Sequence, residues 1–473
     1  MQPRLGDRLL FRTPAKRYLR AMKRVAFLHA DWRDPAEVLA GFADEPFGLG
    51  LLSGGGGPRG RWSYLARRPT RTLVVRAEDP GDAFARMTSL LGPTLDADPD
   101  GPPFQGGLAG LMSYELGYRL EQVGHPAHAD WPQLACALYP AVLAFDHQDQ
   151  KVIAVGRGES QAEARARADE ALQLVQARAP APPAAGTALA EGFEPITPGE
   201  AYERAVADIV RRIGEGEIFQ ANAARAWGGR LRPGAKPIDL MRRLQADSSA
   251  PFGAWFTLPG RAVVSNSPER FIRVTAGRGL SVETRPIKGT RPRGADAMAD
   301  EVLRQELLAC EKDRAENLMI VDLMRNDLSR VCPPGTVEVS ELFKIETFKN
   351  VHHLVSTVTG RLADGLKGLN LLEAAFPPGS ITGAPKVQAI KVIAEYEPPR
   401  GPYCGSIFWA GFDGAADSSV LIRTVALLED ADGWRYEARA GAGIVADSDP
   451  VLERLETEAK IDAIRRALLG SDA

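Results

Sequence analysis

Residues 284–294 read Thr-Arg-Pro-Ile-Lys-Gly-Thr-Arg-Pro-Arg-Gly, and the rest of the chain can be interpreted as placing groups around Lys288. Residues 279–284 alternate as a strand does and Pro286 should end the pairing, so Lys288 is expected at a strand exit. Gly289 has no Cβ, so the backbone there can approach a ligand closely. At the usual lysine pKa of about 10.4, only about 0.04% of the amine is neutral at pH 7, so a nucleophilic Lys288 needs an unusual environment. The alternative is a solvated lysine beside three arginines.

The composition is that of a large globular protein. The 473 residues are enough for two or three domains, or for one large two-lobed unit. The formal net charge of -3, with both signs well mixed, gives no electrostatic case for binding nucleic acid or membranes. No apolar run approaches the ~20 residues that span a bilayer. The four cysteines are scattered without a CxxC pair, which is typical of a reducing cytoplasm and argues against a zinc site or a disulfide framework.

Four regions are expected along the chain. Residues 1–24 carry eight Lys or Arg against one acid and form a basic extension whose order the sequence leaves open. Residues 25–178 are strand-rich, with buried strands near 73–76, 141–145 and 151–155, and end in an exposed helix at 161–178. The Pro- and Ala-rich stretch 179–194 is a linker. Residues 195–470 begin with a helix whose start, Thr197-Pro198-Gly199-Glu200, has the form of a capping box with Pro at the first helical position.

Two predicted helices carry carboxylates at matched spacing. One spans about 300–323 with Asp313 and Glu316, and the other follows Asp449-Pro450 with Glu453 and Glu456. Residues at i and i+3 project from one face of a helix, so each helix can offer two carboxylates to a shared point. Such an all-oxygen set suits Mg2+ rather than zinc. The alternative is that both pairs are simply solvated.

Several of these segments resemble one family. Residues 286–294 resemble the signature loop of the chorismate-utilising enzymes, which include anthranilate synthase component I, aminodeoxychorismate synthase component I, and isochorismate and salicylate synthases. Residues 265–271, 313–327 and 440–460 are similar to other motifs of the family, and the likeness extends over about 45–470. It implies an α+β fold of two stacked antiparallel β-sheets flanked by helices, with both halves contributing strands. Residues 25–178 would be the anthranilate synthase component I-like amino-terminal region, and 195–470 the chorismate-binding catalytic domain.

The resemblance also implies roles for single residues. Anthranilate synthases typically have alanine where this chain has Lys288, and in the aminodeoxychorismate branch the lysine is thought to attack ring carbon C2 of chorismate. Glu269 would be a general acid or base, unless it only pairs with a nearby arginine. His353 would protonate the departing C4 hydroxyl, while His352 points the other way along a strand.

Substrate and metal contacts follow from the same likeness. Mg2+ between the two acidic helices would hold the ring carboxylate, with Asp313 acting through water. Arg423 would clamp the second carboxylate, although a structural ion pair is an equal alternative. The loop 377–386 would close the site, and Phe408 and Trp409 depart from the Gly-Tyr often seen in relatives. The remaining expected contacts to substrate are Gly289, Thr290, Tyr403, Gly441, Ala442, Gly443 and Lys460.

Partners are implied as well. Ammonia would come from a separate glutamine amidotransferase subunit, component II, because the chain lacks a Gly-x-Cys-x-Gly elbow and room for a fused glutaminase. In relatives the amino-terminal half can bind tryptophan. The resemblance therefore favours formation of 4-amino-4-deoxychorismate by a cytoplasmic enzyme. Anthranilate formation is the nearest alternative, disfavoured by Lys288 and the run Gln220-Ala221-Asn222, and a non-catalytic regulator that binds chorismate or tryptophan is an alternative of another class.

Overall fold

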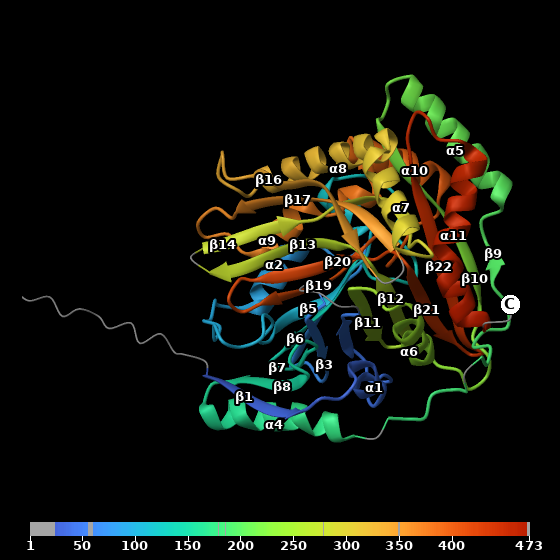
Figure 1. The fold of residues 1–473 in the computed structure, drawn as a ribbon. Coiled ribbons are helices and arrows are strands. Elements are labelled where there is room, and N and C mark those ends of the chain that lie inside the picture. The colour runs from blue at the N-terminus through green and yellow to red at the C-terminus, as the bar shows by residue number, and fades with distance from the viewer. Residues whose placement is uncertain are drawn as a thin grey trace, which may run out of the picture.

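The computed structural model describes residues 24–54, 60–177, 179–184, 186–277, 279–348 and 351–470. The predicted basic extension therefore lies outside the described residues, except for residue 24. Within these ranges the chain forms two antiparallel sheets with helices around them, as the resemblance implied (Figure 1). None of the described helices is long and apolar enough to cross a membrane.

The first sheet has its strands in the order β1-β8-β7-β3-β2-β11-β12-β21-β22-β10-β18, with β9 also paired to β10. Their bounds are β1 Arg24–Asp31, β2 Leu49–Leu52, β3 Trp62–Ala66, β7 Ala141–Asp146, β8 Lys151–Gly158, β9 Glu194–Pro195, β10 Gln220–Arg230, β11 Phe252–Leu258, β12 Arg261–Ser267, β18 Gly383–Ala384, β21 Thr424–Asp430 and β22 Gly433–Ile444. Strand β2, from the first half of the chain, pairs directly with β11 from the second half.

The second sheet runs β15-β17-β14-β13-β20-β19-β5-β6-β4, with β16 on the other edge of β17. Their bounds are β4 Arg71–Val75, β5 Gly107–Met112, β6 Leu134–Tyr139, β13 Arg270–Gly277, β14 Gly279–Thr284, β15 Ile287–Pro292, β16 Glu338–Thr347, β17 Val351–Arg361, β19 Ser406–Gly411 and β20 Ala416–Val420. Here β5 pairs with β19, so the two halves meet again. The halves are joined by backbone hydrogen bonds in both sheets.

The helices cover the sheets and close the ends of the core. They are α1 Pro35–Ala40, α2 Ala83–Leu91, α3 Leu116–Leu120, α4 Gln161–Gln176, α5 Gly199–Gly214, α6 Pro237–Ser248, α7 Ala297–Ala309, α8 Glu311–Ser329, α9 Gly368–Ala375, the 3-10 turn Gly379–Ile381, α10 Lys386–Tyr396 and α11 Pro450–Leu469. Figure 1 shows α8 beside β16 and β17, and α11 alongside β22 and β10. Fully buried aromatic and aliphatic side chains fill the interior, and burying that apolar surface is the main force that stabilises the fold.

Three local expectations are wrong in detail. The predicted helix 300–323 is two helices, α7 and α8, which meet at Cys310 in an extended conformation. Lys288 lies within a second strand, β15, because the chain pairs again with β17 just after Pro286. Helix α5 starts at Gly199 with Pro198 as its N-cap and no side-chain cap, so the capping box is not formed. The start of α11 is confirmed.

Candidate active site

A cavity of about 530 Å3 lies where β15, β17 and α8 of one sheet layer face β10, β22 and α11 of the other. Nearly all the predicted site residues line it: Glu269, Lys288, Gly289, Thr290, Asp313, Glu316, His353, Tyr403, Arg423, Gly441, Gly443, Glu453, Glu456 and Lys460. Ala442 is the exception. Its side chain points to the opposite face of β22 and packs with Tyr202 and Val206 of α5, because neighbouring residues of a strand face opposite ways.

The Lys288 amine is held inside this cavity. Its side chain is 13% exposed, and Nζ lies 3.6 Å from Glu316 Oε2. On its other side is Gly443, where a Cβ would stand 2.8 Å from Nζ. Gly289 has φ 86°, and a Cβ there would stand 2.9 Å from Asp313 Cγ, so only glycine fits comfortably. The alternative of a lysine directed into bulk solvent does not describe this side chain.

Glu269 occupies the two-residue break between β12 and β13, and it is 6% exposed. Ser380 Oγ donates a hydrogen bond of 2.6 Å to Glu269 Oε1. The neighbouring Arg270 pairs with Asp417 and Glu283 instead. Glu269 is therefore not the ion-pair partner of Arg270. Burial raises the pKa of Glu269 to about 7, so near neutral pH it can give or take a proton.

His353 faces the cavity from β17. Its Nδ1 lies 2.8 Å from Thr290 Oγ1. Burial, with the nearby Arg423 guanidinium and the His352 ring, lowers the pKa of His353 to about 4. At neutral pH the ring is therefore uncharged, so it can donate a hydrogen bond but holds no extra proton for a leaving group. His352 points away and contacts Asp300, as expected for the structural histidine of the pair.

Arg423 has a strained backbone and an unpaired charge. Its φ is 52°, in the left-handed region that bulky residues avoid. Burial lowers the pKa of its guanidinium, and only the Tyr403 hydroxyl opposes this effect; no carboxylate of the described chain pairs with it. The predicted alternative of a structural ion pair is therefore not formed. A buried guanidinium without an anion is costly, and such groups are commonly completed by a ligand carboxylate or phosphate.

The two acidic helices face the cavity, but each carboxylate is paired with a cation. The ion pairs join Asp313 to Arg291, Glu316 to Lys288, Glu453 to Lys312 and Glu456 to Lys460, at 2.7–3.6 Å. Nowhere in the described ranges do three His, Cys, Asp or Glu side chains converge as metal ligands. The predicted shared point is thus not formed in this arrangement, because each of the four acids is paired with a lysine or arginine.

The acids nevertheless fit a hard divalent cation by type. All four donors are carboxylate oxygens, the set that Mg2+ prefers. Asp313 Oδ2 is buried and accepts no hydrogen bond, although Arg291 Nη1 lies 3.3 Å away, and burial raises the pKa of Glu316. Neither carboxylate is therefore fully compensated. A cation at this place would complete the compensation.

Residues 56–466 match the profile of the chorismate binding enzymes. The chain belongs to the chorismate binding enzyme family. It is 40% identical over 430 residues to aminodeoxychorismate synthase component 1 of Salmonella typhimurium, covering 87% of this chain and 90% of that protein. It is 38% identical to anthranilate synthase component 1 of Streptomyces coelicolor, covering 86% and 81%. The crystal structure of anthranilate synthase component I from Streptococcus pneumoniae superposes with a TM-score of 0.74 at 27% identity, covering 87% of this chain and 93% of that one.

Sequence reasoning missed part of the site of this chorismate binding enzyme. Gln220 is fully buried, and neither end of its amide has a hydrogen-bond partner among the described residues. Its Nε2 lies 2.4 Å from the point where a Cβ of residue 443 would stand, beside Lys288. Asn222, which the sequence analysis did not count among the site residues, also lines the cavity. The run Gln220-Ala221-Asn222 contained the signal, because residues two apart on a strand share a face.

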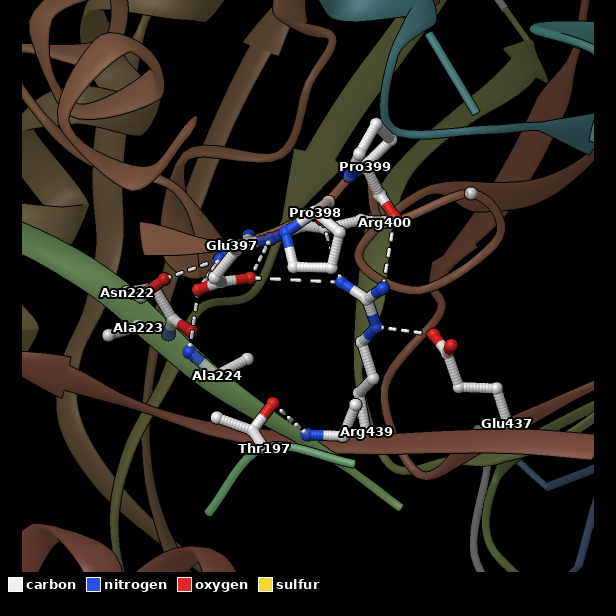
Figure 2. A network of polar contacts seen from close by, with 12 residues as sticks. Thr197, Asn222, Ala223, Ala224, Glu397, Pro398, Pro399, Arg400, Glu437 and Arg439 are labelled. Atoms are coloured by element: carbon white, nitrogen blue, oxygen red, sulfur yellow. Dashed lines mark hydrogen bonds and ion pairs between the residues drawn. The ribbon is translucent and has the colours of Figure 1, made fainter. Parts of the chain in front are cut away.

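A buried polar network packs beside Asn222 of β10 (Figure 2). Arg400 donates to the Asn222 carbonyl at 2.6 Å and pairs with Glu397, which in turn accepts from the Ala224 amide at 2.7 Å. Arg439, which lines the cavity, donates to the carbonyl oxygens of residues 398 and 399. The network therefore fixes the end of α10 to β10 and β22 and keeps Asn222 in place.

Proposed function

We propose that this chain forms 4-amino-4-deoxychorismate from chorismate and ammonia, as the chorismate-binding component of an aminodeoxychorismate synthase on the route to p-aminobenzoate and folate. One observation carries the proposal: the amine of Lys288 lies inside the cavity beside Glu316, and anthranilate synthases typically have alanine in place of this lysine. The relatives named above include both branches, so their names alone do not choose between them.

The proposed reaction uses covalent capture. Arg423 and Tyr403 bind one carboxylate of chorismate. The Lys288 ammonium first loses a proton to solvent, and the amine regains it when the cycle ends. The free amine attacks C2 while the C4 hydroxyl leaves, with a proton from Glu269, as water. Ammonia then adds at C4, the electron pair of the C2–N bond returns to Lys288, and the proton lost by the new amine restores Glu269. Splitting one substitution into two lowers the barrier of each step.

His353, Thr290 and the glycines position the substrate. The neutral His353 ring, oriented by the Thr290 hydroxyl, is a hydrogen-bond donor toward the ring substituents. Beyond residue 438, β22 is not paired with β21, so backbone groups around Gly441 and Gly443 are open to the cavity. Lys460 donates to the Gly441 carbonyl at 2.9 Å and so stabilises this strand end.

Asp313, Glu316, Glu453 and Glu456 are the residues that would hold Mg2+, after giving up their present lysine and arginine partners. When bound, Mg2+ would neutralise the charge of the ring carboxylate. The lysines released from these pairs would remain close to the anionic substrate.

The experiment that tests the function is turnover of the purified chain with chorismate, Mg2+ and an ammonium salt. Direct appearance of fluorescent anthranilate would support the alternative branch. Formation of p-aminobenzoate only after addition of a lyase would support the proposal. Binding of chorismate without turnover would instead support the non-catalytic regulator. Glutamine should replace ammonium only when an amidotransferase component II is added.

A second cavity, of about 100 Å3, lies between the sheets and is lined by residues from both halves of the chain. Trp62, Tyr64 and Trp409 line it together with Arg273 and Asp417. Aromatic walls beside an arginine and a carboxylate suit an aromatic amino acid, and we propose tryptophan as its ligand. Calorimetric titration with tryptophan, with phenylalanine as the control, tests this assignment.

A further inference from the structure

The loop from Pro377 to Lys386, expected to close the site, is instead a buried segment that forms one wall of the active-site cavity. Residues 377–384 are buried throughout. At its end, Lys386 Nζ pairs with Asp327 at 2.9 and 3.0 Å and donates to the Ala375 carbonyl. In its middle, Thr382 receives a hydrogen bond from the Tyr114 hydroxyl and donates to the Pro378 carbonyl. A segment held this firmly does not behave as a lid.

This wall presents one hydroxyl to the catalytic carboxyl group. Ser380 is 6% exposed, and its Oγ lies 2.6 Å from Glu269 Oε1. The other oxygen, Oε2, makes no hydrogen bond to any described residue, and Glu269 lines the cavity. A hydroxyl that donates to Oε1 favours the tautomer in which the acid proton sits on Oε2.

We propose that Ser380 is a positioning residue for Glu269: its hydroxyl holds Oε1 against the wall, so that proton transfer to and from the substrate runs through Oε2. The idea rests on the role of Glu269 as the general acid of the proposed function. The hydroxyl also stabilises the ionised carboxylate, as hydrogen bonds to a charged acceptor do. Ser380 therefore sets both the orientation of the Glu269 carboxyl group and the pH at which this group loses its proton.

The charged groups that face Glu269 are few. Burial raises its pKa, while the Ser380 hydroxyl and the ammonium groups of Lys288 and Lys460, from β15 and α11, lower it. Removing the Ser380 hydroxyl leaves burial and both lysines in place. The pKa of Glu269 should then rise, and the pH above which activity is lost should move upward by about one unit.

The test is the pH dependence of ammonium-dependent turnover in Ser380→Ala. We expect kcat at neutral pH to fall, KM for chorismate to stay within about twofold, and the alkaline limb to move upward by about one unit. Ser380→Thr, which keeps a hydroxyl, should restore the position of the limb. The matched control is Thr382→Val, which loosens the same loop without touching Glu269 and should lower the rate without moving the limb.

A lower rate in Ser380→Ala with an unmoved limb would overturn the inference, because a purely structural role gives that result. So would an equal shift in Thr382→Val. In Glu269→Gln the alkaline limb should vanish, because the acid that produces it is gone; a limb that stayed in place there would also refute the proposal. The wild-type rate in the same assay reports separately on the proposed function, since absence of aminodeoxychorismate there would refute the function itself.

Discussion

Replacing Arg423 by methionine should separate function from stability. Burial lowers the pKa of this guanidinium, which has no carboxylate partner in the described chain, and the residue has a left-handed backbone. Methionine has a similar length and leaves no charge to desolvate. Removing an unpaired buried charge should therefore leave the free energy of unfolding unchanged or raise it by about 1 kcal/mol.

Catalysis should respond in the opposite direction. Loss of a desolvated pair between a guanidinium and a substrate carboxylate costs about 2–5 kcal/mol. At about 1.4 kcal/mol per factor of ten, kcat/KM for chorismate should fall by about 30-fold to several thousand-fold. Steady-state kinetics with ammonium, and urea unfolding followed by circular dichroism, measure the two effects.

A matched control is Arg285→Met. Arg285 is 12% exposed and has carboxylate partners, Glu341 at 3.3 Å and Glu346 at 2.6 Å. Its loss should destabilise the fold and leave the chorismate KM unchanged. If Arg423→Met instead lowered stability as Arg285→Met does and kept the wild-type KM, the guanidinium would be structural and the assignment of the anion site would be wrong.

Three further changes test other parts of the site. Gly443→Ala would place a Cβ 2.4 Å from Gln220 Nε2 and 2.8 Å from Lys288 Nζ, so both side chains must shift and turnover should fall about 100-fold; unchanged turnover would contradict a reacting amine held at this place. Glu269 has a raised pKa of about 7 and acts in its protonated form, so activity should decline as the pH rises through 7, and a flat profile there would contradict the acid role. Lys386→Met would leave Asp327 buried alone and should cost about 3–5 kcal/mol in urea unfolding; a loss below 1 kcal/mol would show that the wall does not depend on this pair.

Local patterns in the sequence predicted the elements with regular alternation or clear caps. The strand at residues 279–284 was predicted with its observed bounds, because alternation and a following proline mark it. Helix α11 begins as predicted. The Asp449 side chain accepts hydrogen bonds from the amides of Val451 and Leu452, and Pro450, at the first helical position, has no N–H group that would need an acceptor. The strand that carries Lys288 was missed because its glycine, proline and arginines conceal any alternation.

Features that depend on neighbours distant in sequence could not be predicted. The break between α7 and α8 falls at Cys310, where the sequence has no glycine or proline that would predict it. The ψ of Cys310, 105°, reflects how α7 and α8 pack separately. Spacing predicted that the acids of α8 and α11 face a common point but could not show that Lys288, Lys312 and Lys460 pair with them. The left-handed backbone of Arg423 is likewise set by its surroundings, since no local rule favours it.

The way the two halves share their sheets has a consequence during synthesis. When only the first 178 residues have left the ribosome, β1, β8, β7, β3 and β2 can pair, as can β5, β6 and β4. The outer edges of β2 and β5 must then wait for β11 and β19, which are made much later. Unpaired edges are the usual starting points for aggregation, so the nascent enzyme should depend on chaperones until its last strands are translated.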